Sequence, residues 1–183
     1  MLSLGQIRQL FLEHDDPRHL ERPEAFDPDA ARECFAWLMS VLEERFGPSC
    51  TGDLAQDASF YGVIDVPADA TGLGRPLRVA MSNFGTYFVT ARGVVDESAP
   101  GSEAALPQEL VTWLDDVCTA AGCTFVPAEL LSERYDGPSL LEAQRDEELI
   151  AALVAAGEVT DGEDEAESDV GVAYWSDRYF AYM

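Results

Sequence analysis

Apolar residues recur at helical spacing over the first fifty positions of the chain. Ser3 followed by Gln6 matches the capping box that starts a helix, and apolar residues then repeat every three or four positions to about residue 13. A longer stretch starts at Asp27, a favourable N-cap residue that precedes a proline, and carries a broad apolar stripe up to Gly47. The pattern predicts two amphipathic helices joined by a polar connection.

The middle of the chain alternates between apolar and polar positions instead. Runs with this period of two, which is typical of half-buried strands, cover 60–66, 77–81 and 86–91. The segment Ser82-Asn83-Phe84-Gly85 lies between the last two runs and carries the Asn and Gly of a turn. These two runs are therefore predicted to form a hairpin.

Helical and extended patterns are mixed in the second half. In chain order, the pattern predicts a helix over 107–121, a short strand over 124–126, a helical turn over 128–132, a helix over 139–156 and a strand over 170–175. The last five residues are too aromatic for a free tail, so we expect the C-terminus to pack on the core.

The order of these elements indicates the fold class. Sequential strands without helices between them predict an α+β fold, with an antiparallel or mixed sheet of three to five strands and helices packed on one face. A length of 183 residues suits one domain over 1–183, and two lobes split near residue 100 are the alternative. Residues 158–169 hold seven acidic side chains in twelve positions, so they are predicted to form an exposed acidic loop.

Charge changes this picture most. The chain has 35 acidic residues and 11 basic ones, all of them arginine, for a net charge of −24. Residues 1–91 carry −7 and residues 92–183 carry −17. Such a field repels nucleic-acid phosphate and anionic lipid and attracts basic proteins. The sequence therefore predicts a basic protein partner, no direct nucleic-acid binding and no membrane association.

The compartment follows from the N-terminus and the cysteines. The first 16 residues lack the basic and apolar regions of a secretory signal, and no run approaches the roughly 18 apolar residues of a membrane span. We expect a cytoplasmic protein whose four cysteines are free thiols. The absence of Lys and the single Asn, residues with A/T-rich codons, favour a GC-rich bacterial genome.

No motif points to a metal, a cofactor or catalysis. The segment His14–His19 holds two histidines and two carboxylates, but its proline breaks a helix and its spacing is that of a polar loop. The acidic run 158–169 lacks the EF-hand pattern, and Cys118 and Cys123 lack zinc-knuckle spacing. The Ser82 turn has no Gly-x-Ser-x-Gly geometry. A non-enzymatic protein without metal or cofactor is therefore expected.

The candidate binding residues are acidic or aromatic. Exposed carboxylates suit a basic partner, and Trp and Tyr are frequent interface anchors. For the aromatic residues core packing is the alternative, with Asp177 and Arg178 as a surface charge pair. The candidates are Asp161, Glu163, Asp164, Glu165, Glu167, Trp175 and Tyr179.

In size, acidity and lack of a catalytic motif, the chain resembles the immunity proteins of bacterial toxin systems. These proteins neutralise a toxin, often a basic nuclease, by binding it. The resemblance, which rests on composition and size rather than on particular residues, implies an acidic binding protein that neutralises a basic protein such as a toxin. The alternatives are a DNA mimic that occupies a nucleic-acid-binding site, an enzyme whose pocket the sequence does not reveal, and a housekeeping domain of a high-GC bacterium.

Overall fold

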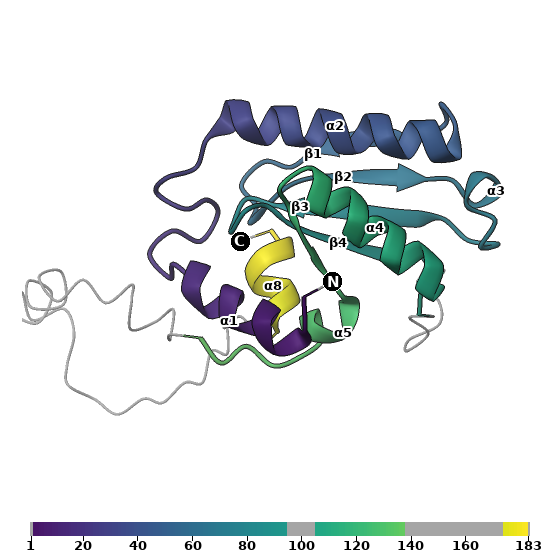
Figure 1. Cartoon of the computed structure of the whole chain (residues 1–183). Helices are drawn as coiled ribbons and strands as arrows, with labels where there is room; N and C mark the ends of the chain where they lie inside the picture. Colours follow the sequence, from purple (N-terminus) through teal and green to yellow (C-terminus); the bar gives the residue numbers. More distant parts are fainter. Residues whose placement is uncertain (1, 95–104, 138–173, 183) are drawn as a thin grey trace, which may run out of the picture.

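The fold is built on a mixed five-stranded sheet. A computed structural model describes residues 2–94, 105–137 and 174–182 (Figure 1). The strands are β1 (Thr51–Leu54), β2 (Phe60–Val66), β3 (Leu77–Ser82), β4 (Phe88–Gly93) and β5 (Thr124–Val126). They lie in the order β1-β2-β3-β4-β5, and all neighbours are antiparallel except β4 and β5, which are parallel. The predicted α+β class is confirmed.

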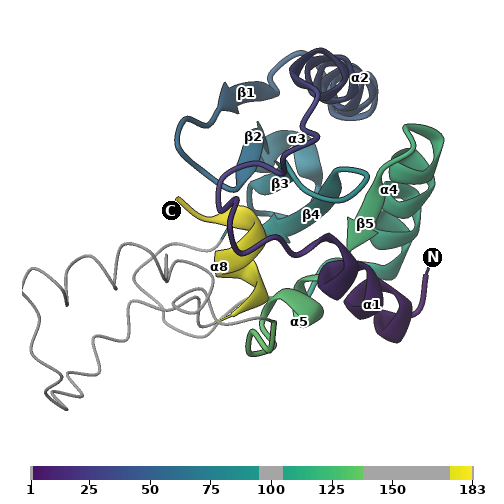
Figure 2. The ribbon, with the colours of Figure 1, turned by 90° about the vertical axis from the view of Figure 1, so that its left-hand side faces the viewer.

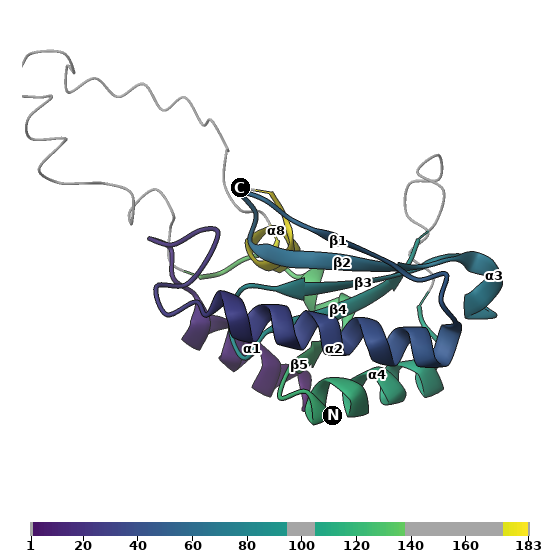
Figure 3. The ribbon, with the colours of Figure 1, turned by 90° about the horizontal axis from the view of Figure 1, so that it is seen from above.

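The helices divide between the two faces of this sheet. They are α1 (Leu4–His14), α2 (Pro28–Phe46), α3 (Ala68–Thr71), α4 (Gln108–Ala120), α5 (Ala128–Leu131) and α8 (Trp175–Phe180). The long helices α2 and α4 lie on one face, as predicted, and α8 lies on the other (Figure 2, Figure 3). The sequence did not predict this second layer.

The helix starts follow the sequence signals. Ser3 and Gln6 form the predicted capping box of α1, and the Asp27 side chain accepts hydrogen bonds from the backbone of Asp29 and Ala30 at the start of α2. The apolar stripe of α2 then faces the sheet, where Phe35 and other buried residues of α2 and α4 meet the inward positions of the strands. This packing makes the main core.

A smaller core lies where α1, α5 and α8 meet the sheet. Its fully buried aromatic side chains make edge-on, tilted and stacked contacts with one another. The backbone N–H and the hydroxyl of Ser59 both donate to the backbone oxygen of Ala181, and the backbone N–H of Ala181 donates to the Ser59 hydroxyl oxygen. These bonds hold the C-terminal residues against the start of β2. The predicted docking of the C-terminus is confirmed. The buried members of this cluster are Ile7, Phe11, Phe84, Phe88, Val126, Leu130, Leu131, Trp175 and Tyr179.

Two predictions differ from the structure. The strand predicted over 170–175 does not extend to its last residue, because Trp175 begins α8 and Asp177 accepts a hydrogen bond from the Tyr174 backbone at the helix start. The sequence also missed β1, whose four residues are all exposed and therefore lack the alternation that marks a strand. The residues of 170–173, the helix predicted over 139–156 and the loop over 158–169 lie outside the described residues.

Residues on both sides of position 100 share one sheet, since β4 pairs with β5. The single-domain organisation of the whole chain stays a prediction. Among the helices that the structure describes, none combines the length and apolar character needed to span a membrane.

Gly62 is a position where the packing requires the absence of a side chain. An added Cβ would lie 2.6 Å from the backbone oxygen of Asp53 and 3.1 Å from the ring of Phe35. We expect Gly62→Ala to lower the free energy of unfolding by about 1–3 kcal/mol, because the neighbouring strand must shift. Urea unfolding measures this loss. Gly5→Ala is the control, since nothing lies within 4 Å of its added Cβ; equal stability of the two variants would contradict the prediction.

Candidate functional site

The structure places the sequence-predicted binding residues in two different situations. Asp161, Glu163, Asp164, Glu165 and Glu167 lie outside the described residues. Trp175 and Tyr179 are described, and both side chains are fully buried in the smaller core. A partner could reach these two rings only after α8 had left the sheet.

The segment His14–His19 forms a structural ion pair. Both Asp15 and Arg178 have fully buried side chains, and the Arg178 guanidinium donates to the Asp15 carboxylate over 2.7 Å. It also donates to the backbone oxygens of Asp16 and Leu20. The expected surface pairing of Arg178 with Asp177 is therefore wrong, because the Arg178 side chain is buried and pairs with Asp15 in the N-terminal loop.

This segment shows no arrangement for a metal. Asp16 contacts His19 over 2.7 Å, and Asp15 accepts a second hydrogen bond, from the Tyr135 hydroxyl, over 2.6 Å. Burial, together with this bond to a carboxylate, raises the pKa of Tyr135. In the described part of the chain no group of three or more His, Cys, Asp or Glu side chains is placed to hold a metal ion.

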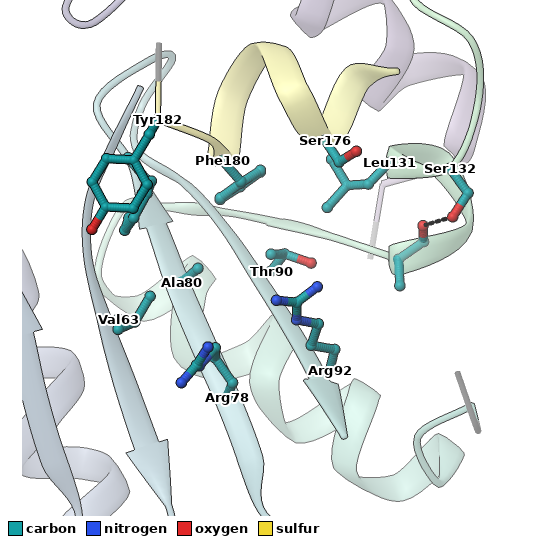
Figure 4. A pocket seen from close by; sticks show the side chains of 12 residues that line it. Val63, Arg78, Ala80, Thr90, Arg92, Leu131, Ser132, Ser176, Phe180 and Tyr182 are labelled. Atoms are coloured by element: carbon teal, nitrogen blue, oxygen red, sulfur yellow. Dashed lines mark hydrogen bonds between the residues drawn. The ribbon is translucent and has the colours of Figure 1, made fainter. Parts of the chain in front are cut away.

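A pocket of about 310 Å³ lies on the face of the sheet that carries α8 (Figure 4). Its floor is formed by outward positions of β2, β3 and β4, and its walls come from α5, α8 and the C-terminal residues. Val63, Ala80 and Phe180 make one part of the lining apolar. Arg78 and Arg92 line the other part. The pocket is therefore apolar on one side and cationic on the other.

The strand register explains the two arginines. Asp65, Arg78 and Arg92 are direct cross-strand neighbours in one row over β2, β3 and β4. The guanidinium of Arg78 donates two hydrogen bonds to the Asp65 carboxylate, over 2.8 and 3.0 Å. Arg92 is exposed and makes no hydrogen bond or ion pair with any other described residue. Sequence reasoning missed this site, because Arg78 lies in a predicted strand but Arg92 follows the end of the predicted run 86–91 and belongs to a strand only in the structure.

The outer surface of α2 and α4 is acidic. It carries seven carboxylates and two arginines, and both arginines are engaged: Arg32 pairs with Asp29 over 2.6 Å, and Arg45 lies 4.2 Å from the ring centre of Trp113. Trp37 of α2 is also exposed, with 38% of its surface open to solvent. The seven carboxylates are Asp29, Glu33, Glu43, Glu44, Glu109, Asp115 and Asp116.

The cysteines are free thiols, as expected. The sulfurs of Cys34 and Cys123 lie 2.9 Å apart, one on α2 and the other just before β5. A hydrogen bond from Cys123 lowers the pKa of Cys34, and the same bond, with burial, raises the pKa of Cys123. Burial raises the pKa of Cys118 to about 12. Cys34 is therefore the member of the close pair that ionises first.

No protein-family model matches the chain, and no curated protein or solved structure matches it either. Fold and site together define an α+β protein with an acidic helical face and, across the sheet, a ligand-sized pocket with two arginines.

Proposed function

We propose that this chain is an acidic, non-enzymatic binding protein that recognises a basic protein through the outer surface of α2 and α4. The observation that carries the proposal is the charge on this surface. Seven carboxylates stand against two arginines, and each arginine already has a partner. A surface of one sign attracts a partner of the opposite sign and speeds association with it.

An exposed aromatic side chain gives this acidic surface an anchor. Trp37 stands on α2, one turn from Glu33, and is 38% exposed. Trp is enriched among the few residues that dominate binding energy in interfaces, where it fills a pocket of the partner. Carboxylates on the same surface as an exposed Trp suit a partner whose basic surface contains an apolar pocket.

The finer proposal is an immunity-type role, in which binding neutralises a basic toxin in the bacterial cytoplasm. Small size, a net charge of −24 and four cysteines without a disulfide support it. A DNA mimic would use the same carboxylates but would bind a protein whose own ligand is nucleic acid. The identity of the captured partner therefore separates the two roles.

A matched pair of variants tests the proposal. The first, Glu33→Gln/Glu43→Gln/Glu44→Gln, removes three charges from α2. The second, Asp53→Asn/Asp57→Asn/Asp69→Asn, removes three exposed charges from the region of β1 and α3. Each full chain is used to capture proteins from a lysate of the source organism at low salt. We expect wild type and the second variant to retain one basic protein that the first variant loses.

The purified partner then gives a quantitative measurement. Its association rate with the wild-type chain should fall about tenfold or more as salt is raised, because exposed charges are screened. Trp37→Ala should raise the dissociation rate without changing this salt dependence. Capture of no basic protein, or equal retention by both charge variants, would overturn the proposal.

A further inference from the structure

The row Asp65, Arg78 and Arg92 has an excess of positive charge. Two guanidinium groups face one carboxylate on three adjacent strands, and the register sets Arg78 directly opposite Arg92. Like charges at such positions destabilise a sheet. The carboxylate is already committed to Arg78 through two hydrogen bonds. The row therefore keeps a net charge of +1 in a chain whose net charge is −24.

Arg92 is the source of this excess. The part of the chain that the structure describes contains 21 acidic residues, and Arg92 pairs with none of them. Its guanidinium, which offers five N–H donors, extends along the sheet towards Thr90 and the middle of the pocket (Figure 4). A single carboxylate placed there would neutralise the row.

The rest of the pocket suits an apolar group. Val63 and Ala80 form the floor beside the arginines, and Phe180 of α8 and Leu131 of α5 stand over it (Figure 4). The volume of about 310 Å³ lies at the lower end of the roughly 300–1,000 Å³ of small-molecule sites. It is about twice the roughly 150 Å³ cavity that accepts benzene.

We infer that this pocket binds a small monocarboxylate with an aromatic or aliphatic body. The carboxylate pairs with Arg92, beside Arg78, and the body lies on Val63 and Ala80 under Phe180. A carboxylate fits the planar fork of a guanidinium in two-point contact. A dianionic phosphate would overcompensate a row of charge +1 and would leave the apolar floor without a contact. This site lies across the sheet from α2 and α4 and does not depend on the proposed protein partner.

Calorimetric titration of the full chain tests the inference. The probes are phenylpropionate, naphthoate and octanoate, each compared with its uncharged amide and with inorganic phosphate. We expect at least one carboxylate to bind with one-to-one stoichiometry and about tenfold or more tighter than its amide, because its charge-assisted hydrogen bonds to Arg92 are lost in the amide. Phosphate should bind more weakly than that carboxylate.

Three variants locate the site. Arg92→Gln should weaken carboxylate binding about tenfold or more. It should not lower the melting temperature, because Arg92 makes no hydrogen bond within the described residues and its charge lies opposite that of Arg78. Arg32→Gln removes the same charge from α2 and should bind like wild type. Ala80→Leu places a larger side chain in the space above the apolar floor. It should weaken carboxylate binding although both arginines are still present.

Several results would overturn the inference. They are the absence of saturable binding for all three carboxylates at millimolar concentration, equal affinity for acid and amide, and unchanged binding by Arg92→Gln. Phosphate binding as tight as carboxylate binding, together with no effect of Ala80→Leu, would show a plain anion site and would contradict the assigned ligand class.

Discussion

Replacement of Arg178 by methionine is expected to lower the free energy of unfolding by about 3–5 kcal/mol, since it leaves a buried carboxylate without its countercharge. Asp15 and Arg178 are both fully buried, and their 2.7 Å contact joins α8 to the N-terminal loop. The same guanidinium satisfies the backbone oxygens of Asp16 and Leu20, which would also lose their donors. Urea unfolding of the full chain, monitored by circular dichroism, measures the loss.

An exposed pair provides the control. Arg8 pairs with Glu133 and Asp136, and its side chain is 38% exposed. Arg8→Met should therefore cost less than about 1 kcal/mol. In a double-mutant cycle, Asp15→Leu with Arg178→Met should cost at least about 1 kcal/mol less than the sum of the two single changes. Additive losses, or an Arg178 loss no larger than that of Arg8, would contradict the prediction.

This ion pair marks a limit of sequence reasoning. The local pattern around Arg178 offers Asp177 as its nearest carboxylate, whereas the true partner is 163 positions away. A pairing of that kind depends on how two segments dock, which neither residue type nor spacing specifies. The start of α1 is the opposite case, because Ser3 and Gln6 satisfy each other within one turn. Elements fixed by local hydrogen bonds were predicted. Docking of the C-terminus was expected too, but the individual residues that it brings together were not.

The C-terminal segment shows how packing overrides a local preference. Aromatic residues around Trp175 favour a strand by propensity, and the sequence prediction followed them. In the structure Trp175 starts a helix, whose first turn Asp177 caps. The helix brings Trp175 and Tyr179 to one side, where their rings stack 5.8 Å apart in the smaller core. A strand would also place residues four apart on one face, but it would hold them much farther apart along the chain direction than one helical turn does.

Prediction of the pocket would have required the register of the strands as well as their positions in the sequence. The predicted run 77–81 contains Arg78 and the predicted run 86–91 ends just before Arg92, and only the pairing of β3 with β4 shows that the two arginines are opposite each other. The acidic helical face was hidden for a similar reason. The sequence drew attention to the run 158–169, while the described residues alone carry a net charge of −11. Their carboxylates gather on α2 and α4 only once the two helices lie on the same face of the sheet.

Oxidation is expected to join Cys34 and Cys123 and to raise the stability of the chain by about 2–4 kcal/mol. Their sulfurs are 2.9 Å apart, and the bond would tie α2 to the start of β5 across 89 positions. The stabilisation arises because a long loop is closed in the unfolded chain. For a chain of this length, the melting temperature should rise by roughly 5–15 °C.

Glutathione disulfide is a suitable oxidant. The Cys34 thiolate, whose pKa is lowered by the hydrogen bond from Cys123, attacks one sulfur and releases a glutathione thiolate. Cys123 then loses its proton, attacks the Cys34 sulfur of the mixed disulfide and releases the second glutathione thiolate. Two protein thiols are thereby oxidised, and one glutathione disulfide is reduced to two thiols.

Mass spectrometry and thermal unfolding with and without reductant measure the two outcomes. The oxidised chain should lose two hydrogens, and a non-reducing peptide map should join the peptides of Cys34 and Cys123. Cys34→Ser and Cys123→Ser should each abolish the gain in melting temperature, whereas Cys50→Ser should keep it, because the Cys50 sulfur makes no contact with another cysteine among the described residues. A map that joins another pair, or an unchanged melting temperature after complete oxidation, would refute the prediction.

The order in which the two thiols react is tested separately. With limiting maleimide, the half-buried Cys34 should be alkylated before the buried Cys123, since Cys34 is the thiol that ionises first.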